Sequence, residues 1–145
     1  MELHITPPLA VLSCRRRLRL PEIGLHAPRV YADLHARARS RGFAADGPPV
    51  FVARDMPMDA QTLFDMDFCL PVKGDDLPLL PPLRCARAIH EGPLAGLFVR
   101  GYQPLLQAIA LAGLRMSGES REVYHAWHGP ESPDNRIEIQ IGLAA

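Results

Sequence analysis

The sequence predicts an α+β domain in which one strand–helix–strand–strand unit occurs twice. Two segments, 64–72 and 135–143, alternate apolar and polar side chains with the period of a β-strand. They align at an offset of 71 residues, from Asp67 to Glu138. Three further identical pairs coincide at that offset: Gly42 and Gly113, Tyr31 and Tyr102, Leu34 and Leu105. We therefore predict duplicated βαββ units with pseudo-twofold symmetry, whose antiparallel sheet has helices on one face and a cleft on the other.

The first repeat is expected at about residues 3–72. Its first strand is predicted over 3–20, where an apolar stretch is followed by an arginine-rich extension. A helix is predicted over about 28–41, because proline is tolerated in a first turn and Gly42 is suited to end a helix. A short strand over 50–53 and the alternating strand over 62–72 complete the unit.

The linker between repeats is expected over about 73–82, which is polar, then proline-rich, and has neither a helical nor a strand period. The second repeat is expected at about 83–143. Its predicted elements are a strand, a helical turn, a helix, a short strand and a final strand, at about 83–89, 94–99, 103–112, 122–125 and 135–143. Pro104 is placed in the first turn of the helix, because proline inside a helix removes a hydrogen bond.

Length and composition favour a single domain over 1–145, long enough to bury about 70% of its unfolded surface. The 16 basic and 16 acidic residues balance, so neither a nucleic-acid nor a membrane partner is expected. Three cysteines without paired spacing are typical of free thiols in a reducing compartment. No signal pattern or long apolar run is present, and a cytoplasmic location is expected.

The candidate ligand site centres on Glu138, on the polar face of the last predicted strand. Tyr124 and Trp127 precede it, and Phe51 and Asp67 hold equivalent places in the first repeat. A carboxylate with aromatic neighbours is suited to hold a flat cation, since the charge is paired and the rings contact the ligand. The alternative is that Glu138 faces water or pairs with an arginine.

The histidines are candidates for metal ligands or for an acid–base pair. His90 lies beside Glu91, and His125 lies near His128, but neither set has a cysteine or carboxylate at a recognised metal spacing. No metal or cofactor is therefore expected, and His90 is kept as a candidate ligand-binding residue. No nucleophile-elbow, phosphate-loop or zinc-protease motif is present, so no catalytic residue is assigned.

The order of short motifs in the second repeat resembles the GyrI-like small-molecule-binding family. The motifs are at 87–93, Tyr102, Leu105, 113–114, 121–124 and 138–141. This family includes effector-binding domains of AraC-type and MerR-type transcription regulators and the DNA gyrase inhibitor protein. The resemblance implies a duplicated βαββ fold with a central cleft, a ligand-pairing glutamate at Glu138 and a tyrosine at Tyr124. Two departures are Pro104 in the second helix and the segment 127–130.

Three functions follow as expectations. The first is a stand-alone binding protein for aromatic, cationic small molecules, since both repeats occupy the chain and leave no DNA-binding segment. The second is a hydrolase of strained electrophilic compounds, with Glu138 and Tyr124 positioning water and a proton. The third is a protein-interaction module that acts on DNA gyrase or another partner, or forms a homodimer.

Overall fold

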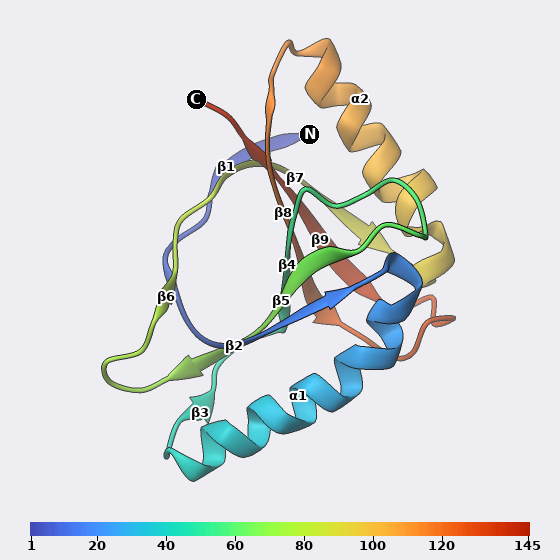
Figure 1. Cartoon of the computed structure of the whole chain (residues 1–145). Helices are drawn as coiled ribbons and strands as arrows, with labels where there is room; N and C mark the ends of the chain where they lie inside the picture. The colour runs from blue at the N-terminus through green and yellow to red at the C-terminus, as the bar shows by residue number, and fades with distance from the viewer. The chain divides into compact units, whose positions relative to one another are not determined.

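The computed structural model describes all 145 residues, and the fold is α+β with antiparallel strands, as predicted (Figure 1). The chain forms two compact units. The first unit consists of residues 8–81, and the second unit of residues 1–7 and 82–145. No helix is both long and apolar enough to cross a membrane.

The first unit has one long helix and a small antiparallel sheet. Its elements are β2 (Leu9–Leu18), the 3₁₀ turn η1 (Leu20–Glu22), α1 (Ile23–Ser40), β3 (Ala44–Ala45), β4 (Val50–Arg54), β5 (Phe64–Lys73) and β6 (Leu79–Leu80). The strand order is β4-β5-β2-β6, and β3 also pairs with β5. The last long strand, β5, is therefore central.

The second unit repeats this arrangement. Its elements are β1 (Glu2–Ile5), β7 (Arg84–Glu91), the 3₁₀ turn η2 (Leu94–Gly96), the π-helical turn η3 (Leu97–Tyr102), α2 (Gln103–Leu111), β8 (Met116–Ala126) and β9 (Arg136–Leu143). The strand order is β1-β7-β9-β8. Its last strand, β9, is central like β5, so the duplicated βαββ topology is confirmed.

The predicted first strand over 3–20 is wrong as a single strand. It divides at the Pro7-Pro8 pair into β1 and β2, because proline has no N–H for a sheet ladder. β1 pairs with β7 of the second unit, and Thr6 extends that ladder through Thr6 N–H to the Leu83 carbonyl at 2.9 Å. Likewise β6, inside the predicted linker, pairs with β2 of the first unit. The segment before each repeat thus joins the first strand of the other repeat.

Prolines lie near the starts of both helices, and glycines follow their ends. α1 starts earlier than predicted, and Pro28 lies inside it; Pro21 occupies the preceding turn η1 instead. Both helices are followed by a glycine with positive φ, Gly42 at +74° and Gly113 at +69°, as predicted. Pro104 lies in the first turn of α2, also as predicted.

The apolar core follows the alternating strands. The side chains of Ile137, Ile139 and Ile141 are buried, as are Leu105 and Ile109 of α2. On the opposite face of β9, Glu138 and Gln140 are only 7% and 6% exposed. Because Glu138 is buried, its carboxylate needs hydrogen-bond or ion-pair partners within the protein.

We predict that Gly142→Ala destabilises the protein by about 1–3 kcal/mol. A Cβ at Gly142 would lie 2.7 Å from the Glu119 carbonyl oxygen and would also contact Ser117 Oγ. The backbone oxygen cannot move away as a flexible side chain can. Urea unfolding measures the loss, and Gly24→Ala in α1, where a Cβ meets nothing within 4 Å, is the matched control. Equal stability of Gly142→Ala and wild type would contradict this packing.

Candidate functional site

The second unit contains a carboxylate held by two tyrosine hydroxyls. The Tyr124 hydroxyl donates to Glu122 Oε1 at 2.8 Å, and the Tyr102 hydroxyl donates a short hydrogen bond to Glu122 Oε2. Glu122 and Tyr124 are two residues apart on β8, so their side chains lie on one face of the sheet. Tyr102 is contributed by the end of η3, next to α2.

The register of β8 and β9 shows which face this is. Glu122 lies opposite Ile139, and Tyr124 lies opposite Ile137. Residues directly opposite in an antiparallel pair share a face. The carboxylate is therefore on the side of the isoleucine core that the α2 segment covers.

Glu122 has no cationic partner. No arginine, lysine or histidine lies within ion-pair distance of its carboxylate. Burial raises the pKa of the Glu122 carboxyl, and the hydrogen bonds from Tyr102 and Tyr124 offset that rise only in part. Burial, together with the nearby Glu122 charge, also raises the pKa of Tyr102 well above its ordinary value. The Glu122 carboxylate is therefore a candidate contact for a positively charged group.

Two further rings extend the site toward the surface. Phe98 stacks on Tyr102 with ring centroids 6.5 Å apart, and Trp127 meets Tyr124 edge to face at 5.6 Å. Phe98 is 45% exposed and Trp127 44% exposed. We call Phe98, Tyr102, Glu122, Tyr124 and Trp127 the Glu122 cluster. It links a partly buried carboxylate to exposed aromatic surface.

Glu138, the predicted centre of the site, has a different environment. It lies opposite Val123, so it is on the other sheet face from Tyr124, and the expected Glu138–Tyr124 pair is wrong. Its oxygens accept from His125 Nε2 at 2.9 Å and Gln140 Nε2 at 2.7 Å, and Arg87 is 3.5 Å away. His125 follows Val123 by two residues on β8 and reaches the Glu138 carboxylate from this face.

The charge of Glu138 is therefore balanced inside the protein. Burial raises the pKa of its carboxyl, but the hydrogen bonds from Gln140 and His125 and the positive charge of Arg87 outweigh burial and leave the pKa below 4.5. The alternative considered from the sequence, a pair with an arginine, describes Glu138 correctly.

We predict that Glu138→Gln destabilises the protein at neutral pH by about 1–3 kcal/mol, because charge-assisted hydrogen bonds are lost. A lowered carboxyl pKa adds stability above the unfolded value of 4.5, and this is lost as pH falls through the folded value. The gap between wild type and variant should therefore shrink in acid. Urea unfolding at neutral pH and well below pH 4.5 measures it, and a gap that is independent of pH would contradict the assignment.

His90 has a local structural contact. Its side chain is 3% exposed, and its Nε2 lies 2.9 Å from the Pro93 carbonyl oxygen. It pairs across the sheet with Ile137, on the core face. The His90 Nε2, a candidate ligand contact from the sequence, is therefore already in contact with the Pro93 carbonyl in the turn before η2.

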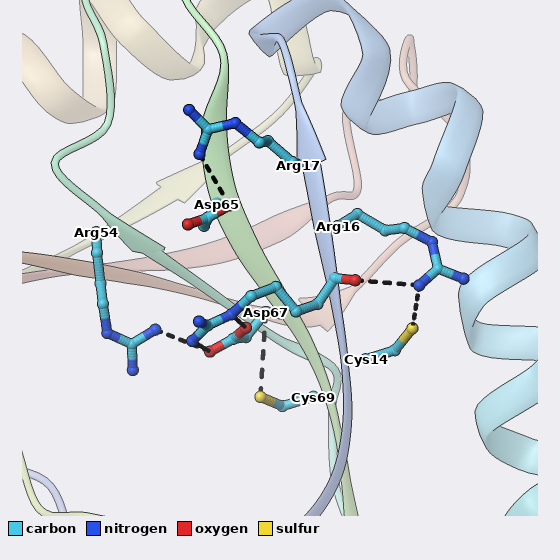
Figure 2. Close-up of polar contacts among 8 residues, drawn as sticks. Cys14, Arg16, Arg17, Arg54, Asp65, Asp67 and Cys69 are labelled. Atoms are coloured by element: carbon cyan, nitrogen blue, oxygen red, sulfur yellow. Dashed lines mark hydrogen bonds and ion pairs between the residues drawn. The ribbon is translucent and has the colours of Figure 1, made fainter.

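The first-unit candidates are also satisfied within that unit. Asp67 lies between two guanidinium groups, Arg15 at 2.7 Å and Arg54 at 2.8 Å, and Figure 2 shows Asp65 next to it, paired with Arg17. Burial raises the pKa of Asp67, but its bonds to Arg15 and Arg54 lower it overall. Asp67 thus forms part of a network of ion pairs.

Phe51 lies on the opposite face from Asp67, because it pairs with Phe68 whereas Val52 pairs with Asp67. Its ring stacks on Tyr31 at 5.7 Å and meets Phe68 edge to face at 5.2 Å. It is buried, and these contacts make it part of the first unit's aromatic core.

The sequence-based candidates include Tyr124 and Trp127 but not Glu122, Tyr102 and Phe98, which the structure places in the same cluster. Two signals were present. Glu122 precedes Tyr124 by two residues, and Tyr102 is the counterpart of Tyr31, which stacks in the first unit. The alternating pattern that identified β9 as a strand pointed to Glu138 on that strand and not to Glu122 on β8.

Comparison with solved structures identifies the fold. The C-terminal domain of EcmrR superposes with a TM-score of 0.79 and 19% identity over 99% of this chain and 96% of that domain. EcmrR in its DNA complex matches with a TM-score of 0.80 and 19% identity over 98% of this chain, which spans 56% of that longer chain. At this identity the likeness shows a shared fold, and the expected GyrI-like fold is confirmed.

Two other structures share this fold. SAV2435, solved with tetraphenylphosphonium bound, gives a TM-score of 0.58 and 11% identity over 100% of this chain and 95% of its own. A hydrolase from Listeria innocua gives 0.64 and 13% identity over 99% and 91%. Comparison of the sequence with protein-family models and with curated proteins gives no match.

Proposed function

We propose that this chain is a small-molecule-binding protein that takes aromatic cations at the Glu122 cluster. The observation that carries the proposal is a carboxylate with a raised pKa and no cationic partner, hydrogen-bonded to two tyrosines whose rings contact Phe98 and Trp127. Glu138 and Asp67 were the earlier candidates, but both are already paired with cations of the protein.

A buried carboxylate without a positive partner is costly to ionise. Ionised Glu122 is unfavourable in its partly buried place, because the two tyrosine hydroxyls do not supply a positive charge. A cationic ligand provides that charge. Ring faces of Tyr and Trp attract cations, and an aromatic ligand also buries apolar surface against Phe98 and Trp127. A bulky delocalised cation gains both contributions while losing little hydration.

The comparisons support this proposal. SAV2435, which shares the fold, was solved with tetraphenylphosphonium, an aromatic cation. EcmrR carries a domain of this fold within a longer DNA-bound protein. We propose that occupancy of the Glu122 cluster either sequesters a toxic compound or regulates a partner, as an effector domain does.

The test uses two ligands of matched shape and opposite charge. Tetraphenylphosphonium should raise the melting temperature, whereas tetraphenylborate should not. A ligand that binds only the native state stabilises it by about 2.7 kcal/mol at one hundred times its Kd. Equal shifts with both ions would show that apolar contact alone drives binding. An unchanged melting temperature with both ions would contradict small-molecule binding at this site and favour the protein-interaction alternative.

A second candidate function is hydrolysis of a strained electrophile at the same cluster. The observation that favours it is the geometry of Glu122 beside two tyrosine hydroxyls, together with the direction in which burial shifts its pKa, upward from 4.5; both suit a general acid or base. A hydrolase from Listeria innocua shares the fold. Product formation from a cyclopropane-type electrophile, lost in Glu122→Gln, would support turnover, and binding without product would exclude it for that compound.

A further inference from the structure

β1 is an edge strand whose outer side is open. It ends the strand order of the second unit and pairs only with β7. Leu3 is 57% exposed and Ile5 66% exposed. Because Thr6 donates its N–H to Leu83, alternate residues of β1 bond to β7, and the main-chain groups of Leu3 and Ile5 point away from it.

The edge strand β6 of the first unit is protected in a way that β1 is not. β6 has only two residues, and Pro78 and Pro81 flank it, so its ladder cannot be extended. The part of β2 beyond β6 carries Arg15, Arg16 and Arg17. In β1 no proline or lysine interrupts residues 1–6.

We propose that two copies of this chain pair through β1, antiparallel and centred on Leu3. In that register Leu3 lies opposite the partner's Leu3, and Met1 lies opposite the partner's Ile5. All these residues have outward main-chain groups, so the ladder hydrogen bonds can form. The sheet of the second unit then continues across a twofold axis into the second copy.

Side chains complement one another in this register. Met1, Leu3 and Ile5 share one face, and each is more than half exposed in the single chain. Pairing them buries apolar surface that the monomer leaves in water. On the other face Glu2 lies opposite the partner's His4, so unlike groups meet. Glu2 already accepts from Arg87 at 2.6 Å, and that bond orders its carboxylate.

The neighbouring register is less favourable. Centring the pair on His4 places His4 opposite its own copy and Glu2 opposite the partner's Thr6, so the unlike pairing is lost. The interface spans about five residue pairs before Pro7 ends the strand, which is small for a permanent dimer. A reversible, concentration-dependent dimer is the expected result.

The first test is sedimentation velocity over a concentration series up to millimolar. Wild type should move from 16.0 kDa toward twice that mass. Leu3→Pro should remain monomeric at concentrations about tenfold higher, because proline removes an outward N–H while sparing the bonds to β7. His4→Glu should weaken association similarly by placing like charges together. Leu111→Ser, which removes a 90% exposed leucine from α2, should associate as wild type does.

The second test determines which residues of the two β1 strands lie opposite each other. Paired residues at the centre are about 5.5 Å apart between Cα atoms, within the span of a disulfide. Leu3→Cys should therefore form an interchain disulfide on mild oxidation. Ile5→Cys should not, since the two copies of position 5 are roughly 13 Å apart at about 3.3 Å per residue. Wild-type protein, oxidised in the same way, controls for interchain disulfides formed by the native cysteines. A monomeric wild type at all concentrations, or equal cross-linking at positions 3 and 5, would overturn the proposal.

Discussion

Glu122→Gln should lower the affinity for tetraphenylphosphonium by about 10- to 100-fold, because a charge-assisted contact contributes about 1.5–3 kcal/mol. Glutamine keeps the shape of the side chain and removes its charge. It also removes the group whose ionisation is opposed by burial, so the variant should remain folded at neutral pH. The expected loss is therefore in binding and not in structure.

Isothermal titration calorimetry measures this effect, with Glu138→Gln as the matched control. Glu138 lies on the opposite face of the sheet and is paired with His125 and Arg87, so its variant should bind within about twofold of wild type. The two variants make the same chemical change sixteen positions apart in the sequence. A larger loss in Glu138→Gln than in Glu122→Gln would return the site to the position first considered.

The affinity for the cation should rise with pH until Glu122 is ionised and then become constant. Only the carboxylate attracts a cation, and burial raises the pKa of this group above 4.5, so part of the population is protonated in weak acid. Below that pKa the apparent affinity should fall by up to about tenfold per pH unit.

Calorimetry in two buffers of different ionisation enthalpy provides an independent reading. Because a bound cation favours the carboxylate, binding near the pKa of Glu122 should release a proton. Glu122→Gln should show neither the pH slope nor the proton release. A wild-type affinity that rises toward low pH would contradict a site that depends on this carboxylate.

Much of the fold could be predicted because it depends on local chemistry. Alternation identified β5 and β9, positive-φ glycines end both helices, and the offset between repeats predicted matching topologies. The exchange of β1 and β6 between repeats could not be predicted, because pairing of short strands depends on distant partners. Only the diproline pairs marked the breaks.

The site was harder to predict for a related reason. A period of two assigns polar residues to a face, but it does not show which of them the protein itself neutralises. The environment of Glu138 depends on Arg87 from β7 and on His125 from β8. Glu122 is distinguished by lacking such a partner. Glu138 has cationic partners and Glu122 has none, and this difference exists only once the strands have paired in their final register.

The most direct measurement is the pKa of the Glu122 carboxyl itself, by carbon-13 NMR of glutamate-labelled protein with the resonance assigned from Glu122→Gln. In the free protein the pKa should lie above 4.5. On saturation with tetraphenylphosphonium it should fall, because the cation stabilises the ionised form. The Glu138 resonance should titrate below 4.5 and change little. A Glu122 pKa that is the same with and without the ligand would contradict its role as the ligand's counter-charge.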